Sequence, residues 1–578
     1  MIRLIVWRRL AWVAGLVAIV LSLGAAFSAY RLADYSWNQV VEYESPFADP
    51  HRLWTRGIVA SSEETAGARL ALVIVDGLTL EDSYEMVGLQ TVRGYGADMV
   101  ATTAQPSLSY PGWTTILSGA PPQISGVTTN WFENEAPVET LLDLALAAGK
   151  RVVVVGLDDL ETLFDAHRAS GVHLRPWDES EYMSADFVSK ALELVEKHDS
   201  ELLILHLPDA DEIAHLHGSD SDEYEDVVSR IDTDIARLVT ELQDARTTFV
   251  IVSDHGQVAA GGHGGWEAEV TRVPAIFFGR GVTLDRGNIS QVDIAPTVAA
   301  LLGVEVPRHA AGRVRAEVLI DDGPLAFGQE QYRTFAKRYV QTLGEPESVL
   351  EGSRTYDEIE AVVNRVSKQR LAKDREARVP LGLGFAAAAA LILVLVAILS
   401  WRGLVAALAG MVAYYALYNG LFFLLHGYLW SLSAFNNEDL IQSFFNWRMI
   451  EAGIAGLVAA GVAAIVYPMI RRDPRGATGT YRAGWIALGP ATVLVVQATL
   501  ALQVGWFLWA WGAEVTWRLP DLMWGFKYDL DLIQATALGA AAILSPMVTY
   551  IVGRYHPMVR RAERERFAEE VPPGAGAV

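Results

Sequence analysis

The composition places part of this chain in lipid. Its 578 residues are 51% hydrophobic with a mean hydropathy of +0.22, which is high for a purely soluble protein. The formal charge of -23 and a pI near 5.0 argue against a nucleic-acid partner, because a phosphate backbone needs a basic surface. The chain has no cysteine, so disulfides, thiolate metal sites and a cysteine nucleophile are excluded. Any metal must therefore be bound by His, Asp or Glu.

The first apolar segment, residues 10–30, follows three arginines and is long enough to cross the ~30 Å hydrocarbon core as a helix. We expect it to form an uncleaved N-terminal anchor within residues 1–30. A cleaved signal peptide is the alternative, since residues 24–26 are small, but the apolar run is longer than a usual signal-peptide core.

The C-terminal part of the chain is also apolar. Candidate spans lie near residues 380–400, 403–428, 449–470, 484–511 and 532–553. With the anchor they give about six spans, which places both termini on the same side. Just before them, apolar residues at positions 359, 362, 363 and 366 recur at helical spacing and indicate a stalk helix. The expected units are an anchor (1–30), an extracytoplasmic globular domain (31–350), a stalk helix (351–379), a transmembrane region of about five helices (380–553) and a cytoplasmic tail (554–578).

The distribution of arginine predicts the orientation. One loop contains four arginines: Arg471, Arg472, Arg475 and Arg482. They fall on the same face of the membrane as the N-terminal arginines and the arginines of the tail. That face should be cytoplasmic, because positive charge collects on the inner side of membranes. A basic cluster at residues 365–378 lies on the opposite face, but long translocated domains follow this rule weakly. We therefore expect an integral protein of the plasma membrane with both termini in the cytoplasm.

Residues 31–350 have the pattern of an α/β domain, in which a mostly parallel central sheet is flanked by helices. Four apolar runs are typical of buried parallel strands: Leu70–Val75, Val152–Val155, Leu202–Leu207 and Phe249–Val252. The complete fold class is this α/β domain joined to an all-α transmembrane region.

Aspartates follow three of the four predicted strands. Asp76 follows the first, Asp209 and Asp211 follow the third, and Asp254 follows the fourth. A single aspartate in such a place is more often a helix cap or a turn residue. Several carboxylates at one sheet edge instead favour a ligand site, because α/β sheets bind ligands beyond the carboxyl ends of their strands.

Histidines accompany these aspartates at spacings that suit metal binding. Asp211 and His215 are four residues apart, which places both on one face of a helix. His255 directly follows Asp254, and His263 lies in a glycine-rich segment where the backbone can turn sharply. The set suffices for two divalent ions with mixed nitrogen and oxygen ligands. Zinc suits these ligands best, and manganese is the alternative.

The ordered motifs resemble the type I phosphodiesterase and nucleotide pyrophosphatase branch of the alkaline phosphatase superfamily. The resemblance covers most of residues 70–313 and rests on the segments 72–77, 106–112, 208–215, 253–256, 262–264 and 292–303. It implies that Ser109 is the nucleophile and also contacts the metals. It further implies one ion held by Asp76, Asp254 and His255, and a second ion held by Asp211, His215 and His263.

The resemblance also bears on the substrate. Many nucleotide pyrophosphatases have Asn where this chain has Gly112, which puts nucleotide substrates in doubt and suggests room for a bulkier ester. The Ser-x-Pro-Gly pattern and the layout of spans are similar to those of glycosylphosphatidylinositol ethanolamine-phosphate transferases. The leading expectation is therefore a phosphodiesterase or phosphotransferase with a phosphoserine intermediate and a phosphate-ester substrate, with lipid-linked phosphodiesters favoured over soluble esters.

Several alternatives remain open at this point. Thr114 or Thr115 could replace Ser109 as nucleophile, although both are expected to lie in the following helix. His206 and His217 are expected to be structural. Five tryptophans are typical of the outer membrane interface, and a groove for lipid headgroups is the alternative interpretation of the same residues: Trp506, Trp509, Trp511, Trp517 and Trp524.

Other functions compete less well. A sulfatase would need an arginine at the position that Trp113 occupies. A surface phosphatase or nucleotide pyrophosphatase acting on soluble esters needs no multi-span region. An inactive metal-binding sensor or a transporter subunit is a different class, but every expected ligand type is present and the spans carry few charges for an ion path. The sequence does not determine the oligomeric state.

Overall fold

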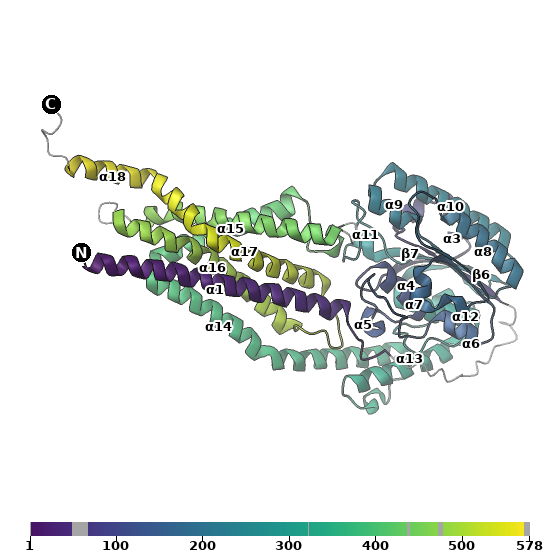
Figure 1. Cartoon of the computed structure of the whole chain (residues 1–578). Helices are drawn as coiled ribbons and strands as arrows, with labels where there is room; N and C mark the ends of the chain where they lie inside the picture. Colours follow the sequence, from purple (N-terminus) through teal and green to yellow (C-terminus); the bar gives the residue numbers. More distant parts are fainter. Residues whose placement is uncertain (1, 49–67, 322, 436–439, 472–477, 571–578) are drawn as a thin grey trace.

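The computed structural model describes residues 2–48, 68–321, 323–435, 440–471 and 478–570. The molecule is elongated, with an α/β domain at one end and a bundle of long helices at the other (Figure 1). Helix α1 (Ile2–Val41) begins, and α17 (Leu522–Tyr555) ends, at the end of the bundle that lies away from the α/β domain.

An eight-stranded sheet in the order β4-β3-β5-β1-β6-β7-β2-β8 forms the centre of the α/β domain. The strands are β1 (Arg69–Val75), β2 (Gly96–Thr102), β3 (Val152–Leu157), β4 (Gly171–Arg175), β5 (Leu202–Leu207), β6 (Thr247–Ser253), β7 (Arg272–Gly279) and β8 (Asp285–Ser290). The four predicted strands are β1, β3, β5 and β6, which are adjacent and parallel. Only β7 runs antiparallel to its neighbours β6 and β2 among these strands. The predicted fold class, a mostly parallel sheet flanked by helices, is confirmed.

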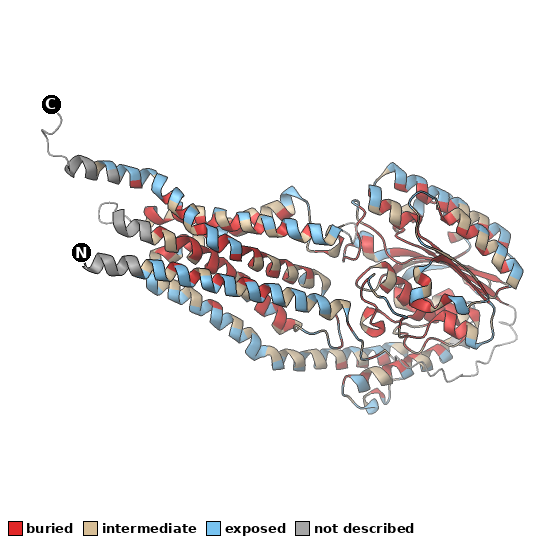
Figure 2. Ribbon diagram, in the orientation of Figure 1, coloured by how far each residue is buried: buried red, intermediate tan, exposed pale blue. Residues whose placement is uncertain are grey.

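Helices cover both faces of the sheet, and the buried residues lie between the layers (Figure 2). Alternate residues of β1 enter two separate cores: Leu72 and Ile74 enter one, and Val73 and Val75 enter the other. The helices of this domain are α2 (Asp82–Glu85), α3 (Val87–Arg93), α4 (Ser109–Ser118), α5 (Pro122–Ser125), α6 (Leu141–Ala147), α7 (Asp159–Phe164), α8 (Ser184–His198), α9 (Asp209–His217), α10 (Asp222–Leu242), α11 (Ala268–Thr271), α12 (Ile294–Leu302) and α13 (Gly323–Thr342).

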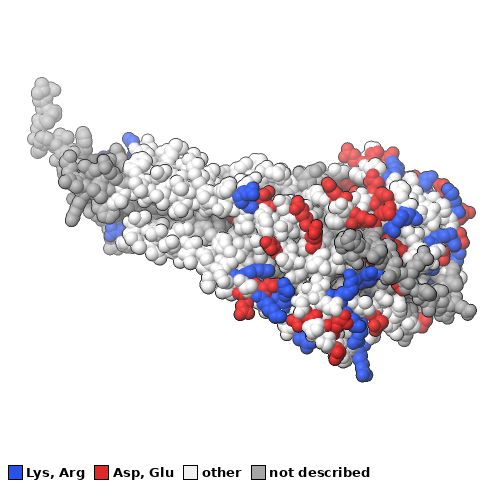
Figure 3. Space-filling model, turned by 60° about the horizontal axis from the view of Figure 1, so that its bottom comes forward, with Lys and Arg blue, Asp and Glu red and all other residues white. Residues whose placement is uncertain are grey.

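Five helices of the described residues are long and apolar enough to cross a membrane. They are α1, α14 (Tyr356–Asn419, extended to Leu425 by a π-helical turn), α15 (Ile441–Arg471), α16 (Thr478–Ala510) and α17. The surface of this part carries few charged residues compared with the α/β domain (Figure 3). A shorter helix, α18 (Pro557–Glu570), follows α17. A bilayer requires each spanning segment to satisfy its own backbone hydrogen bonds, as helices do. Because several helices are also long and apolar enough to span it, the chain is a membrane protein.

Helix α14 turns back on itself at Ser400, where the backbone leaves the helical conformation (φ -163°, ψ 95°). Before this point Gly382 packs beside Trp509, near the end of α16. After it, Phe422 packs in a cluster with Phe526, near the start of α17. Because a short loop joins the end of α16 to the start of α17, both arms of α14 reach the same end of the bundle. The predicted spans 380–400 and 403–428 correspond to these two arms.

The first turns of α14 belong to the α/β domain. Ile359, Val362 and Val366 are buried in its core, as the helical spacing of the apolar residues suggested. Further along, Asp374 accepts a hydrogen bond from the Trp517 indole at 2.9 Å. The stalk therefore contacts both parts of the molecule. Two arginines used in the orientation argument, Arg472 and Arg475, and the final residues 571–578 lie outside the described residues.

Candidate active site

Ser109 is the first residue of α4, and it is buried, with 7% of its surface exposed. Its hydroxyl oxygen lies 3.3 Å from His255 Nε2. The N-terminus of a helix carries partial positive charge and unpaired N–H groups, which favour a bound phosphate. Thr114 and Thr115 lie further along α4 and are fully buried, and the Thr115 hydroxyl donates to the Pro111 carbonyl. The helix thus places Ser109 at the site and both threonines in its packed interior.

The first group of candidate ligands surrounds His255 Nε2. Asp76 follows β1 and Asp254 follows β6, and these adjacent parallel strands bring both carboxylates to one sheet edge. His255 Nε2 lies 3.3 Å from Asp76 Oδ1 and 3.6 Å from Asp254 Oδ2. Their ligand atoms all lie within 4.8 Å of one another, so one ion can reach all three. Ser109 borders this group through the same His255 nitrogen.

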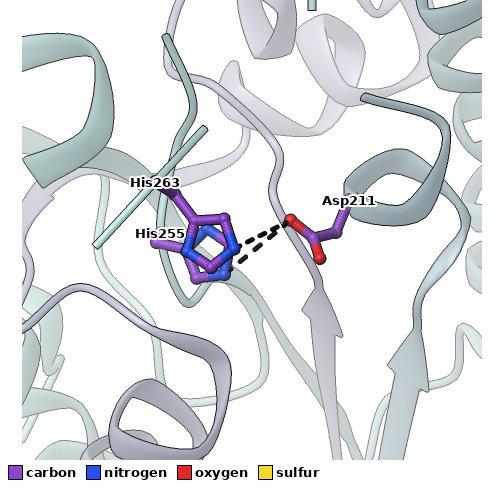
Figure 4. Close-up of side chains that lie close together, drawn as sticks. All are labelled: Asp211, His255 and His263. Atoms are coloured by element: carbon purple, nitrogen blue, oxygen red, sulfur yellow. Dashed lines mark ion pairs between the residues drawn. The ribbon is translucent and has the colours of Figure 1, made fainter. Parts of the chain in front are cut away.

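The second group comes from α9 and the glycine-rich segment. His215 Nε2 lies 3.1 Å from Asp211 Oδ2, as expected for residues one helical turn apart. His263 Nε2 lies 3.3 Å from His215 Nε2 and 3.7 Å from Asp211 Oδ1. Figure 4 shows the stacked rings of His255 and His263 facing Asp211. Because these two rings are only 3.8 Å apart between centroids, the two groups form one continuous site.

Neighbouring groups orient these candidate ligands. His206 Nε2 donates to Asp76 Oδ2 at 2.9 Å, and Gln257 Nε2 donates to Asp211 Oδ1 at 2.7 Å. His263 Nδ1 donates to the Ser107 carbonyl at 3.1 Å, which turns its Nε2 towards the site. Hydrogen bonds of this kind fix the ring orientation of metal-binding residues. The sequence pattern predicts a structural role for His206 and does not single out Gln257. The sequence signal for His206 is a single histidine within an otherwise apolar strand. In the structure, His206 of β5 pairs with Ile74 of β1, two residues before Asp76.

Three other residues have structural roles. Asp209 accepts hydrogen bonds from the backbone N–H groups of Met183 and Ser184, so it supports the start of α8 and is not a ligand of this site. His217 is exposed on α9. A Cβ at Gly112 would lie 3.0 Å from Asp254 Cβ, so close packing of α4 against Asp254 also accounts for this glycine.

Buried charge dominates the electrostatics of the site. Burial raises the pKa of Asp254 well above its ordinary value, and the negative charge of Asp76 adds to this effect. Burial opposes ionisation of Asp76 too, but the hydrogen bond from His206 and the nearby His255 ring lower its pKa. Burial alone would lower the pKa of His255, yet the carboxylates of Asp254, Asp76 and Asp211 outweigh it and raise the pKa to about 10. Without a cation, the cluster therefore retains protons that metal binding would displace.

The first group of residues fits a divalent cation. Two buried carboxylate oxygens that face the first group, Asp76 Oδ1 and Asp254 Oδ2, accept no hydrogen bond. Buried carboxylate oxygens without a donor are costly unless a cation pairs with them. Asp254 Oδ1, in contrast, accepts from the backbone N–H groups of Gly77 and His255. One oxygen of each carboxylate is thus held by the protein and the other is left for an ion.

Comparison with known proteins identifies this domain. Residues 70–265 match the family model described as type I phosphodiesterase / nucleotide pyrophosphatase, and this segment contains all seven candidate site residues. Residues 70–265 are therefore similar to this family, and the predicted resemblance is confirmed.

Curated relatives are also known. GPI ethanolamine phosphate transferase 1 of Mus musculus is 24% identical over 298 residues, which cover 42% of this chain and 32% of the relative. The catalytic subunit of GPI ethanolamine phosphate transferase 2 of Homo sapiens is 25% identical over 267 residues, covering 42% of this chain and 27% of the relative. The chain thus matches a third or less of the length of these proteins.

Solved structures that are similar include wild-type alkaline phosphatase PafA, with 13% identity and a TM-score of 0.37, covering 44% of this chain and 99% of that chain. Murine ectonucleotide pyrophosphatase / phosphodiesterase 5 has 13% identity and a TM-score of 0.36, covering 41% of this chain and 96% of that chain.

Two histidines on α9 provide a test of the ligand assignment. We expect His215→Ala to lower the metal content of the purified full-length protein by about one ion per chain, because the second group loses a ligand. His217→Ala should leave the metal content unchanged, since this side chain is exposed two residues away. Elemental analysis by mass spectrometry measures both. Equal metal content in the two variants would contradict the assignment of His215.

Proposed function

We propose that this protein is a metal-dependent phosphodiesterase or phosphotransferase that acts through a phosphoserine intermediate. The observation that carries the proposal is the position of Ser109, whose hydroxyl lies 3.3 Å from His255 Nε2 at the start of α4. Asp76, Asp254 and His255 would hold one divalent ion there. Asp211, His215 and His263 would hold the other. We propose zinc for both, with manganese as the alternative.

The reaction we propose has two displacements at phosphorus. The ions, when bound, would lower the pKa of the Ser109 hydroxyl and neutralise charge on the phosphoryl oxygens. Ser109 Oγ, having lost its proton to solvent, forms a bond to phosphorus while the bond to the first alcohol breaks, and that alcohol leaves with a proton. A second alcohol or water then attacks the phosphoserine and restores the Ser109 hydroxyl. The N-terminus of α4 favours the phosphate throughout.

Replacement of Ser109 tests this mechanism. Ser109→Ala should lower turnover of an aryl phosphodiester by at least about 10³-fold, because a nucleophile acts on the transition state, while metal content and thermal stability stay near those of the wild type. Thr114→Val is the matched control. The buried Thr114 hydroxyl neither accepts nor donates a hydrogen bond, so its replacement should change turnover only as far as it changes stability. Near wild-type activity in Ser109→Ala would reject the phosphoserine route through Ser109 and would move the role of nucleophile to Thr114, Thr115 or a metal-bound hydroxide.

We further propose that the substrate is a lipid-linked phosphodiester and that transfer to a hydroxyl acceptor competes with hydrolysis. Two features support this. The curated relatives are named GPI ethanolamine phosphate transferases. In addition, the chain has several helices that can cross a membrane, although one would suffice as an anchor. Ethanolamine phosphate is accordingly the first group to test. Hydrolysis of soluble esters at the cell surface is the second candidate.

A substrate competition distinguishes these candidates. Full-length protein in vesicles should release ethanolamine phosphate, or transfer it to added glycolipid acceptors, from phosphatidylethanolamine at least about 10-fold faster than it hydrolyses a soluble nucleotide diester at equal concentration. The same assay with Ser109→Ala gives the background. Faster turnover of the soluble diester, with inorganic phosphate or a nucleotide as the only product, would contradict the lipid proposal.

The orientation is also a proposal. The arginine distribution favours cytoplasmic termini and an extracytoplasmic catalytic domain at the plasma membrane. The tryptophans at the ends of α16 and α17 nearest the α/β domain suit the outer membrane interface. There the ring centroids of Trp506 and Trp524 lie 4.8 Å apart. A phosphatase reporter fused after residue 566 should therefore be inactive and a fluorescent reporter active, as expected for a cytoplasmic C-terminus. The reverse pattern would invert the orientation.

A further inference from the structure

The loop between α14 and α15 extends from the helical bundle to the α/β domain. Residues 430–435 of this loop lie against the segment that contains His263. The Trp266 indole N–H donates to the Trp430 carbonyl at 2.9 Å. Ser433 makes two hydrogen bonds to the same segment: its hydroxyl oxygen accepts from the Gly265 N–H at 3.1 Å, and the hydroxyl donates to Glu267 Oε2 at 3.0 Å. A loop of the membrane region is thus bound directly beside the candidate metal site.

The glycines around His263 are required by this contact. A Cβ at Gly265 would lie 1.9 Å from Ser431 Oγ and 2.5 Å from Ser433 Oγ. A Cβ at Gly262 would lie 2.5 Å from the Ser433 carbonyl oxygen. Contacts this short are sterically forbidden, so larger residues would separate the loop from the segment. The glycines therefore serve the contact between the two parts of the molecule as well as the turn of the backbone.

The same segment also contacts the nucleophile region. Gly264 forms an isolated antiparallel bridge with Ser107, two residues before Ser109. His263 Nδ1 donates to the Ser107 carbonyl at 3.1 Å. The backbone around His263 is therefore held between the start of α4 and the membrane loop, and either contact restricts where its Nε2 can lie.

The membrane loop is itself anchored. His426 Nε2 lies 2.9 Å from Glu451 Oε1, and Arg448 NH1 lies 3.0 Å from Glu451 Oε2. Only 3% of Arg448 is exposed, and its guanidinium lies 5.1 Å from the centre of the Tyr428 ring. Buried charges that are paired in this way fix the geometry of the groups around them. The loop consequently approaches Ser433 from a fixed base on α15.

We propose that Ser433 is a positioning residue for His263, so that the membrane region helps to form the second metal site of the α/β domain. Its hydroxyl fixes the Gly265 N–H and the Glu267 carboxylate, and these fix the chain on the C-terminal side of His263. The inference rests on the proposed two-metal function. It adds that the affinity of the second ion depends on a residue 170 positions away, in a loop between two membrane helices.

Metal affinity of the full-length protein in detergent tests this proposal. Competition between the protein and a chelator for Co²⁺ gives the affinity of each ion, and the visible absorption of bound Co²⁺ reports its ligand geometry. We expect Ser433→Ala to weaken the second ion about 10-fold or more, with an altered spectrum, and to leave the first ion unchanged. Ser433→Thr retains the hydroxyl and should restore most of the affinity. Ser443→Ala, at an exposed serine of α15, is the matched control and should bind both ions like the wild type.

Each outcome has a definite meaning. Wild-type affinity for both ions in Ser433→Ala, equal weakening of both ions, or a Ser433→Thr variant as weak as Ser433→Ala would overturn the positioning role. Wild-type protein that binds no divalent ion would overturn the proposed function itself. If Ser433→Ala does not fold, Trp266→Phe is the second variant. It removes the hydrogen bond to Trp430 and shortens a side chain that is 44% exposed, and it should also weaken the second ion selectively.

Discussion

Burial of negative charge at one sheet edge is the constraint that organises this site. Asp76, Asp211 and Asp254 have at most 6% of their surface exposed and lie close enough to repel one another. Such a cluster is costly unless cations or donors compensate each oxygen. His206 and Gln257 each hold one oxygen, and backbone N–H groups hold another. The arrangement of α4, α9 and the strand ends follows from the need to keep the remaining oxygens directed at one place.

Much of this site could be predicted because its parts are local in sequence. Strands β1 and β6 were visible as apolar runs, and an aspartate directly after a buried parallel strand must lie at the sheet edge. The four-residue spacing of Asp211 and His215 placed both on one face of a helix before the structure was known. The metal content and the role of Ser109 stay predictions, because they depend on chemistry that the fold makes possible and does not itself display.

Other parts depend on contacts between distant segments. Asp209 and Asp211 are equivalent in a sequence pattern, and only the packing of α8 shows that Asp209 supports Met183 and Ser184. The hydropathy pattern predicts the two helical arms of α14. It does not predict where the next loop contacts the α/β domain, because the hydrogen bond between Gly265 and Ser433 joins residues 168 positions apart. The sequence indicates only that the glycine-rich segment has a flexible backbone. The steric reason for its glycines depends on the loop that packs against it, and that contact is seen only in the structure.

The contact between the membrane loop and the His263 segment also determines how a substrate meets the site. Helix α14 continues from the buried stalk through Pro380 into its first membrane arm, so the α/β domain is held at a fixed height above the bundle. The lipid-linked substrate proposed above would reach a site held in this way by lateral diffusion in two dimensions, and its effective concentration would be its mole fraction in the bilayer. For such a substrate, dilution of the vesicles in buffer leaves the rate per enzyme unchanged, whereas dilution of the substrate with inert lipid lowers it.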